Sequence, residues 1–144
     1  MATEHPARRA GLLSQKYVSE KNRDAWLDLF AEDAFIQDPV GRSPLDPDGK
    51  GHQGKAAITK FYDDVIAKGN VSFDYPKSYA AGDECAFIGV VYADFPGAPP
   101  SEGSEGVFIY RVNDEGKLIS LRAFWEFERP RWQGEAHPPV GRTR

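Results

Sequence analysis

The carboxyl group of Asp38 is the side chain in this sequence whose setting best suits chemistry. It ends a short apolar segment, residues 34–38, and directly precedes Pro39, and proline biases the residue before it toward extended backbone. A carboxylate at the end of a strand beside an apolar pocket can accept a proton, because apolar walls raise its pKa. An Asp-Pro pair is also a common start of a turn. This segment alone therefore leaves a purely structural role open.

A second candidate is the hydroxyl of Tyr110, which shares a predicted strand face with Phe108. It could bond a ligand, although a core tyrosine that bonds a backbone carbonyl is the simpler alternative. The three histidines are His5, His52 and His137. No two of them have the spacing of metal ligands, so we expect no metal site.

Helical spacing of apolar residues covers much of the first half of the chain. This spacing occurs in three segments: one after Pro6, one after Asp24, and one from Lys55 to Gly69. Each segment predicts a helix. Asn22 is a suitable N-cap for the second helix, because its side chain can accept a hydrogen bond from a free backbone N–H group. Residues 41–54, rich in glycine and proline, predict a long loop.

From residue 71 the apolar period changes from 3.6 to 2, which predicts strands. They cover residues 71–75, 85–95, 107–112 and 118–127. Helices followed by such a meander predict an α+β fold, in which three helices pack against a curved, mainly antiparallel sheet and enclose a pocket. Fourteen of the 18 aromatic residues lie between Phe61 and Trp132, and large rings on a concave face line an apolar cavity well.

The last hairpin, which turns at residues 113–116, decides which side chains face the pocket. If Val112 pairs with Lys117, one face holds Phe108, Tyr110, Ile119, Leu121, Ala123, Trp125 and Phe127. The opposite face then holds Val107, Ile109, Leu118 and Phe124 among polar residues. A slip of one residue would exchange the two sets.

The length of 144 residues suits one domain, residues 1–128, followed by an extended, locally basic tail, residues 129–144. The net charge of −4 argues against nucleic acid as a partner. No apolar run approaches the ~20 residues that a membrane helix needs. The start of the chain lacks the apolar core of a signal peptide, and the single cysteine, Cys85, has no partner for an internal disulfide. We therefore expect a cytoplasmic protein.

Residues 29–41, LFAEDAFIQDPVG, resemble the segment of the Δ5-3-ketosteroid isomerases that ends in their catalytic aspartate. The similarity continues through residues 54–62, 110–117 and 122–125, and it spans about residues 10–127. The wider nuclear transport factor 2-like superfamily includes SnoaL-type polyketide cyclases. The resemblance implies a cone-shaped α+β fold with an interior cavity, which agrees with the architecture inferred above.

In the isomerases an aspartate moves a proton between two carbons of a steroid enone, while a tyrosine and a protonated aspartic acid stabilise the dienolate. The resemblance places the aspartate at Asp38. It matches Trp125 to a pocket tryptophan of some members, and Tyr62 to a helix tyrosine that supports the oxyanion tyrosine. That oxyanion tyrosine has Tyr17 as its nearest match, whereas the gapless match is Ser14.

The chain departs from the isomerase pattern at Phe108, which stands where the family has its oxyanion aspartic acid. A phenyl ring cannot donate that hydrogen bond, and the loss of one oxyanion donor typically lowers the rate ~100- to 1,000-fold.

Three hypotheses follow. The first is an isomerase-like enzyme that needs no cofactor, with Asp38 as general base on a small apolar carbonyl compound of steroid or polyketide type. Tyr17 or Tyr110 would hold the enolate oxygen, and three side chains would shape the pocket: Tyr62, Phe108 and Trp125. The second is a non-catalytic protein that binds a steroid, polyketide or lipid-like ligand. The third is a dimerisation scaffold, because the apolar outer face suits a symmetric partner, and we expect a homodimer.

Overall fold

The structure of the protein, a computed structural model, describes residues 4–126. The elements follow one another as α1 (Pro6–Ser19), α2 (Arg23–Asp28), β1 (Phe30–Gln37), β2 (His52–Gln53), α3 (Gly54–Asp64), the 3-10 helix η1 (Ile66–Lys68), β3 (Asn70–Ala81), β4 (Glu84–Asp94), β5 (Ser104–Val112) and β6 (Leu118–Phe124). The predicted tail, residues 129–144, lies outside the described residues, as does Phe127.

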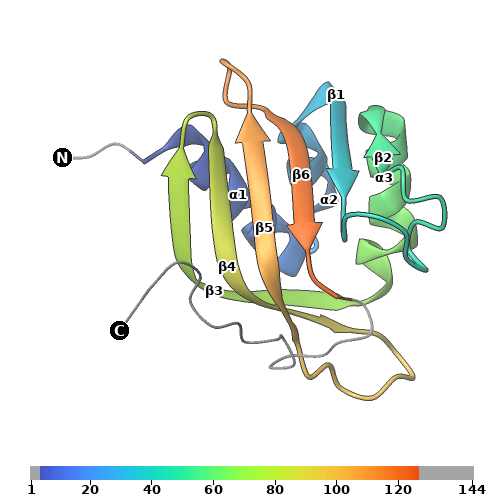
Figure 1. Ribbon diagram of the computed structural model, residues 1–144. Helices are drawn as coiled ribbons and strands as arrows, with labels where there is room; N and C mark the ends of the chain where they lie inside the picture. The colour runs from blue at the N-terminus through green and yellow to red at the C-terminus, as the bar shows by residue number, and fades with distance from the viewer. Residues whose placement is uncertain (1–3, 127–144) are drawn as a thin grey trace, which may run out of the picture.

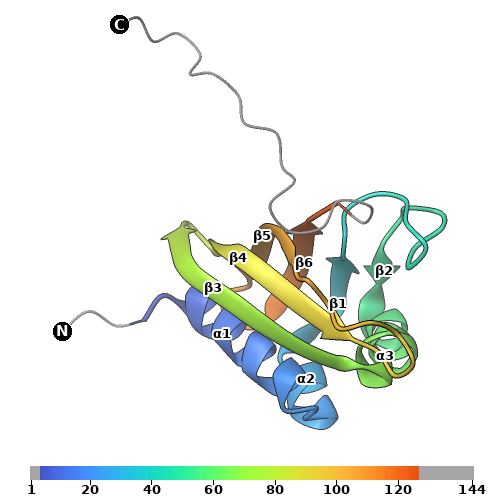
Figure 2. The ribbon, with the colours of Figure 1, turned by 90° about the horizontal axis from the view of Figure 1, so that it is seen from below.

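The strands form one six-stranded sheet in the order β2-β1-β6-β5-β4-β3. Neighbouring strands are antiparallel except β1 and β6, which run parallel. Figure 1 shows α1 and α2 behind this sheet and α3 beside β1 and β2. In Figure 2, α1 and α2 lie along one face of the curved sheet. The predicted α+β architecture, with three helices against a mainly antiparallel curved sheet, is confirmed. None of the helices within residues 4–126 is long and apolar enough to cross a membrane.

The helix ends follow the sequence signals only in part. Asn22 is the N-cap of α2, and its side-chain oxygen accepts a hydrogen bond from the backbone N–H of Ala25 at 3.4 Å. The helix has only six residues, so β1 starts at Phe30, four residues before the predicted strand. The third helix ends at Asp64 instead of continuing to Gly69, and η1 fills the interval.

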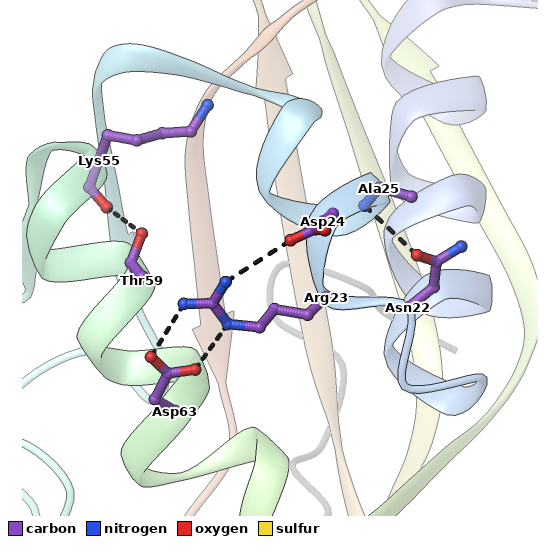
Figure 3. A network of polar contacts seen from close by, with 7 residues as sticks. All are labelled: Asn22, Arg23, Asp24, Ala25, Lys55, Thr59 and Asp63. Atoms are coloured by element: carbon purple, nitrogen blue, oxygen red, sulfur yellow. Dashed lines mark hydrogen bonds and ion pairs between the residues drawn. The ribbon is translucent and has the colours of Figure 1, made fainter.

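Polar contacts tie α2 and α3 together on the side of the molecule next to β1 (Figure 3). Arg23 donates two hydrogen bonds to the carboxylate of Asp63, at 2.8 and 3.0 Å. Lys55, at the start of α3, donates to the backbone carbonyl of Phe30 at 2.8 Å. These contacts fix the short α2 and the start of β1 relative to α3.

The predicted register of the last hairpin is wrong along its whole length, by one residue at the turn and by two residues beyond it. Val112 pairs with Leu118 instead of Lys117, and a bulge makes Ile119 an extra residue in β6. Leu118 is consequently fully buried, although the prediction placed it on the outer face, and Ile119 is half-buried. A bulge has this effect because the side chains beyond it change faces.

Beyond the bulge the predicted inner face is confirmed although the predicted pairs are not, because a shift of two residues keeps every side chain on its face. Phe108 pairs with Ala123 and Tyr110 pairs with Leu121, and all four residues are buried.

Small side chains on α1 let the helix approach the sheet closely. Gly11 has no Cβ, and one placed there would lie 2.5 Å from the ring of Phe87 and 2.8 Å from the ring of Tyr110. These two rings meet edge to face, with centroids 5.4 Å apart. Gly11 therefore positions Tyr110 as well as closing the core.

We expect the substitution Gly11→Ala to lower the free energy of unfolding. Alanine favours a helix by ~1 kcal/mol over glycine, but overpacking of a core costs about 1–3 kcal/mol, and here two rings would have to move. The net loss should be about 1 kcal/mol, measured by urea denaturation. Arg9→Ala, at an exposed position of the same helix, should change stability by less than ~0.5 kcal/mol. A Gly11→Ala variant as stable as the native chain would contradict this account of the packing.

Candidate functional site

An apolar cavity of about 110 Å³ lies between the helices and the inner face of the sheet. Four phenylalanines line it: Phe61, Phe73, Phe95 and Phe108. Aliphatic side chains from α1, η1 and the sheet form most of the remaining wall. The polar groups that reach the lining, apart from the indole N–H of Trp26, belong to Ser14, Asp38, Tyr110 and Trp125. The aromatic-rich second half of the chain thus contributes to a pocket, as the sequence suggested.

Asp38 follows β1 directly and lines this cavity. The indole N–H of Trp125 donates a hydrogen bond to its Oδ1 atom at 2.7 Å. Trp125 follows β6, and because β6 is parallel to β1, with Gln37 opposite Arg122, the two strands end at the same edge of the sheet. The parallel pairing therefore brings together two residues that are 87 positions apart.

Burial raises the pKa of the Asp38 carboxyl to about 6, and the hydrogen bond from Trp125 opposes this shift because it favours the charged form. The group is mostly ionised at neutral pH and more basic than an exposed aspartate. It can therefore accept a proton from a ligand and give it back.

Tyr110 lines the cavity and is almost fully buried. Burial raises the pKa of its hydroxyl, and the charge of Asp38 adds to the shift, while Gln15 and Ser14 oppose it. The hydroxyl therefore stays protonated and can donate a hydrogen bond. Phe108, two residues earlier on the same face, also lines the cavity, and its ring has no donor.

Helix α1 presents Ser14 and Val18 to the cavity, one turn apart. The Ser14 hydroxyl accepts a hydrogen bond from the indole N–H of Trp26 at 3.0 Å. Tyr17 is half-buried and is not among the residues that line this cavity within residues 4–126. The sequence left three candidates for the hydroxyl that holds the enolate oxygen: Ser14, Tyr17 and Tyr110. Of these, Ser14 and Tyr110 line the cavity.

Tyr62 lies behind the wall rather than in it. Its side chain is buried, and its ring centroid is 5.3 Å from that of Trp26, which lines the cavity. The neighbouring Phe61 reaches the cavity instead. Tyr62 can therefore shape the pocket through Trp26.

The long loop contributes one residue that the sequence reading missed, Leu45, which lines the cavity. The loop is anchored by a backbone pair between Ser43 and Asp46, and the Asp46 carboxylate accepts from the N–H of Gly51 at 2.7 Å. Leu45 is the only large aliphatic side chain between residues 41 and 54. An isolated leucine in a polar loop could have identified Leu45 as a residue that packs into the interior.

Within residues 4–126, no three side chains of His, Cys, Asp or Glu are grouped so that they could hold a metal ion. Cys85 is fully buried in the core, as expected for a small apolar residue.

Comparison with known proteins identifies the family of this fold. Residues 15–121 match the sequence profile of the SnoaL-like domain. The chain belongs to the SnoaL-like family. The predicted resemblance to this superfamily is thereby confirmed.

Two solved structures resemble this SnoaL-like protein over nearly their whole length. RV0760c from Mycobacterium tuberculosis, in complex with estradiol-17beta-hemisuccinate, is 36% identical with a TM-score of 0.81, and the match covers 86% of this chain and 96% of that one. Δ5-3-ketosteroid isomerase from Mycobacterium sp. is 33% identical with a TM-score of 0.76, and the match covers 85% of this chain and 95% of that one.

A curated relative is the epoxide hydrolase LasB from Streptomyces lasalocidi, which is 26% identical over 148 residues. The match covers 100% of this SnoaL-like chain and 50% of the relative. The chain therefore spans about half the length of that protein.

We expect Trp125→Phe to raise the pKa of Asp38 above its value of about 6. The substitution keeps an aromatic ring but removes the N–H group that stabilises the carboxylate. A hydrogen bond to a charged group contributes about 1.5–3 kcal/mol, so the pKa should rise by roughly one unit or more. Carbon-13 NMR titration of the Asp38 carboxyl measures the shift. An unchanged or lowered pKa would show that the indole does not stabilise the charge.

We also expect the effect of Asp38→Asn on stability to become more favourable as the pH rises from about 4 to about 7. The folded pKa of Asp38 is above the unfolded value of 3.8, so between about pH 4 and pH 6 the folded state binds more protons, and stability falls as the pH rises. Asparagine does not titrate, so the stability of the variant relative to the native chain should increase across this window by on the order of 2 kcal/mol.

Urea denaturation of both proteins at about pH 4 and about pH 7 measures this difference, and the other titrating groups cancel in the comparison. A difference that is the same at both pH values would mean that the Asp38 carboxyl is solvated.

Proposed function

We propose that this SnoaL-like protein is an isomerase-like enzyme that moves a proton within a small apolar carbonyl compound, with Asp38 as general base. The observation that carries the proposal is the carboxyl of Asp38, which faces an apolar cavity, receives a hydrogen bond from Trp125, and has a pKa of about 6. A base is most effective when its pKa lies near the working pH.

In the proposed reaction, the Asp38 carboxylate removes a proton from the carbon between a carbonyl group and a carbon–carbon double bond. The C–H bond breaks, an O–H bond forms on Asp38, and the electron pair spreads onto the carbonyl oxygen as a dienolate. Asp38 then returns the same proton to the far carbon, which gives the conjugated enone. No atom is gained or lost, and one carboxyl group serves as base and then as acid.

Tyr110 is the donor that we assign to the enolate oxygen. Its hydroxyl is protonated, lines the same cavity as Asp38, and interacts electrostatically with that carboxylate. Donors that are fixed before the reaction stabilise developing negative charge most effectively. Phe108 and Trp125 then shape the cavity, and Tyr62 supports it from behind.

The size of the cavity limits the substrate. Pockets for drug-sized ligands usually enclose ~300–1,000 Å³, whereas this one encloses about 110 Å³. It suits a small carbonyl compound, or the reacting ring of a larger steroid- or polyketide-like one. The similarity to a protein bound to estradiol-17beta-hemisuccinate and to a ketosteroid isomerase supports this substrate class. The homodimer and the cytoplasmic location remain predictions.

A second candidate function is the opening of an epoxide, which the similarity to LasB favours. That reaction needs a base for the attacking oxygen and an acid for the leaving oxygen. Among the residues described, Asp38 is the one carboxyl group that lines the cavity, so only a hydroxyl such as Tyr110 would remain as acid. An isomerisation, in which one group fills both roles, fits this composition better.

The substitution Asp38→Asn tests the proposal, because it preserves shape and removes the base. With 3-cyclohexen-1-one and a Δ5-3-ketosteroid as substrates, the conjugated product is followed by its ultraviolet absorbance. The native protein should turn over at least the small ketone, with a rate that rises as the pH passes through about 6. The variant should lose ~100- to 10,000-fold in rate and still bind the product enone.

Asp74→Asn, on an exposed part of β3, is the matched control and should keep the native rate. If neither ketone is isomerised by the native protein although both bind, the non-catalytic binding hypothesis is correct instead. Hydrolysis of a small epoxide that also depends on Asp38 would favour the second candidate.

A further inference from the structure

The long loop between β1 and β2 contributes the side chain of Leu45 to the cavity wall. Among the described residues, every other member of the wall belongs to a helix or strand or directly adjoins one. Figure 1 shows this loop on the side of the molecule next to α3. Leu45 is half-buried, and Pro44 and Pro47 on either side of it are exposed. A side chain that lines a cavity and also meets the solvent lies at the boundary between the two.

A hydrogen-bonded turn holds Leu45 at this boundary. The N–H of Asp46 donates to the carbonyl of Ser43 at 3.0 Å, which closes a β-turn with Pro44 and Leu45 at its two central positions. Proline is favoured at the first of these positions, because its ring fixes φ near the value that the turn requires. The N–H of Leu45 also donates to the Ser43 hydroxyl at 3.1 Å. Several contacts therefore fix the backbone that carries this leucine.

Asp46 connects the turn to the end of β1. Its backbone carbonyl accepts a hydrogen bond from the N–H of Gly49 at 3.0 Å, and its carboxylate accepts one from the N–H of Gly51 at 2.7 Å. Gly51 lies directly against the strand, because a Cβ atom on it would be 2.8 Å from the carbonyl oxygen of Ile36. The turn is thus tied to the strand that leads to Asp38.

The cavity wall also meets the solvent at Phe95, which is 38% exposed and directly follows β4. Its ring lies against the backbone of Gly69, where an added Cβ atom would be 2.6 Å from it. Phe95 belongs to the end of a paired strand, on the far side of the sheet order from β1. Leu45, in contrast, is linked through Asp46 to the strand that leads to the proposed base, so the arrangement of leucine and base is fixed.

We propose that Leu45 determines how large a ligand the cavity accepts, and that Asp46 positions it. The cavity encloses about 110 Å³, whereas pockets for drug-sized ligands usually enclose ~300–1,000 Å³, so a ligand with more than one ring has to extend past the boundary. The side chain of Leu45 occupies space that such a ligand needs. The inference rests on the proposed function in placing the ligand in this cavity, but it concerns binding alone and requires no turnover.

The test compares two ketones, cyclohexanone and 2-decalone, because the second is the first with another six-membered ring fused to it. Dissociation constants are measured by nitrogen-15 NMR titration, and the indole N–H signal of Trp125 reports entry into the cavity. We expect Leu45→Ala to raise the affinity for 2-decalone relative to cyclohexanone about 10-fold, the effect of burying roughly two more methylene groups. Leu45→Met keeps the bulk and should keep the native ratio. The matched control is Leu12→Ala, at a leucine 45% exposed on α1 and outside the cavity wall, and it should also keep the native ratio.

Asp46→Ala tests the positioning role. Loss of the contact with the N–H of Gly51 should free the turn and shift the ratio toward 2-decalone, in the same direction as Leu45→Ala and less strongly. In the double variant with Leu45→Ala, the Asp46 substitution should no longer change the ratio, because no side chain is left to position. A merely structural effect would lower the melting temperature of the single and double variants alike and leave the ratio unchanged.

The inference is overturned if Leu45→Ala leaves the ratio unchanged, if it changes the affinity for both ketones equally, or if neither ketone shifts the Trp125 signal. It is also overturned if Phe95→Ala raises the ratio and Leu45→Ala does not, because the limiting boundary would then lie at the end of β4.

The proposed function fails separately. If the ratio depends on Leu45 but no unsaturated ketone is isomerised, the size limit stands without the enzyme. If isomerisation depends on Asp38 but the ratio does not depend on Leu45, the enzyme stands without the size limit.

Discussion

The hydrogen bond between Trp125 and Asp38 is the contact on which the site depends. A carboxylate that faces an apolar cavity loses most of its hydration, and an ionised group in such a place needs compensation. One donor at 2.7 Å supplies part of it, so the group stays charged at neutral pH with a raised affinity for a proton. A second strong donor would make the carboxylate less basic, and the loss of the indole donor would keep it protonated to a higher pH. The single indole sets the balance between these states.

Irregularities in the strand pairing determine where particular side chains of the sheet point. The extra residue Ile119 in β6 lets Leu118, which pairs with Phe30 of β1, turn into the core, whereas the extra residue in β3 places Tyr75 over Gly89. A regular, uniformly alternating sheet would have directed these side chains elsewhere. On the opposite wall, Gly11 lets α1 approach the ring of Tyr110. The position of this hydroxyl thus depends on the absence of one methyl group.

The sequence predicted the features that local chemistry determines. The cap at Asn22, the α+β order of elements and the place of Asp38 at a strand end all follow from residue types and spacing. The bulge at Ile119 could not be predicted, because Leu118 and Ile119 are both apolar and either of them fits the buried face next to the turn. The spacing of Ser14 and Tyr17 also does not tell which of the two lines the cavity, because residues three apart share a helix face. Only the packing of the helix against the sheet decides this.

The polar groups of the site also explain why one carboxyl group can suffice. Burial raises the pKa of Tyr110, the charge of ionised Asp38 adds to this shift, and the hydroxyl is protonated and available as a donor. When Asp38 accepts a proton, that repulsion disappears, and negative charge develops on the substrate oxygen instead. The total charge enclosed by the cavity stays constant while its position changes. Moving one charge between two sites that are already prepared for it costs less than creating a new charge in an apolar interior, and this difference favours proton transfer within a single substrate.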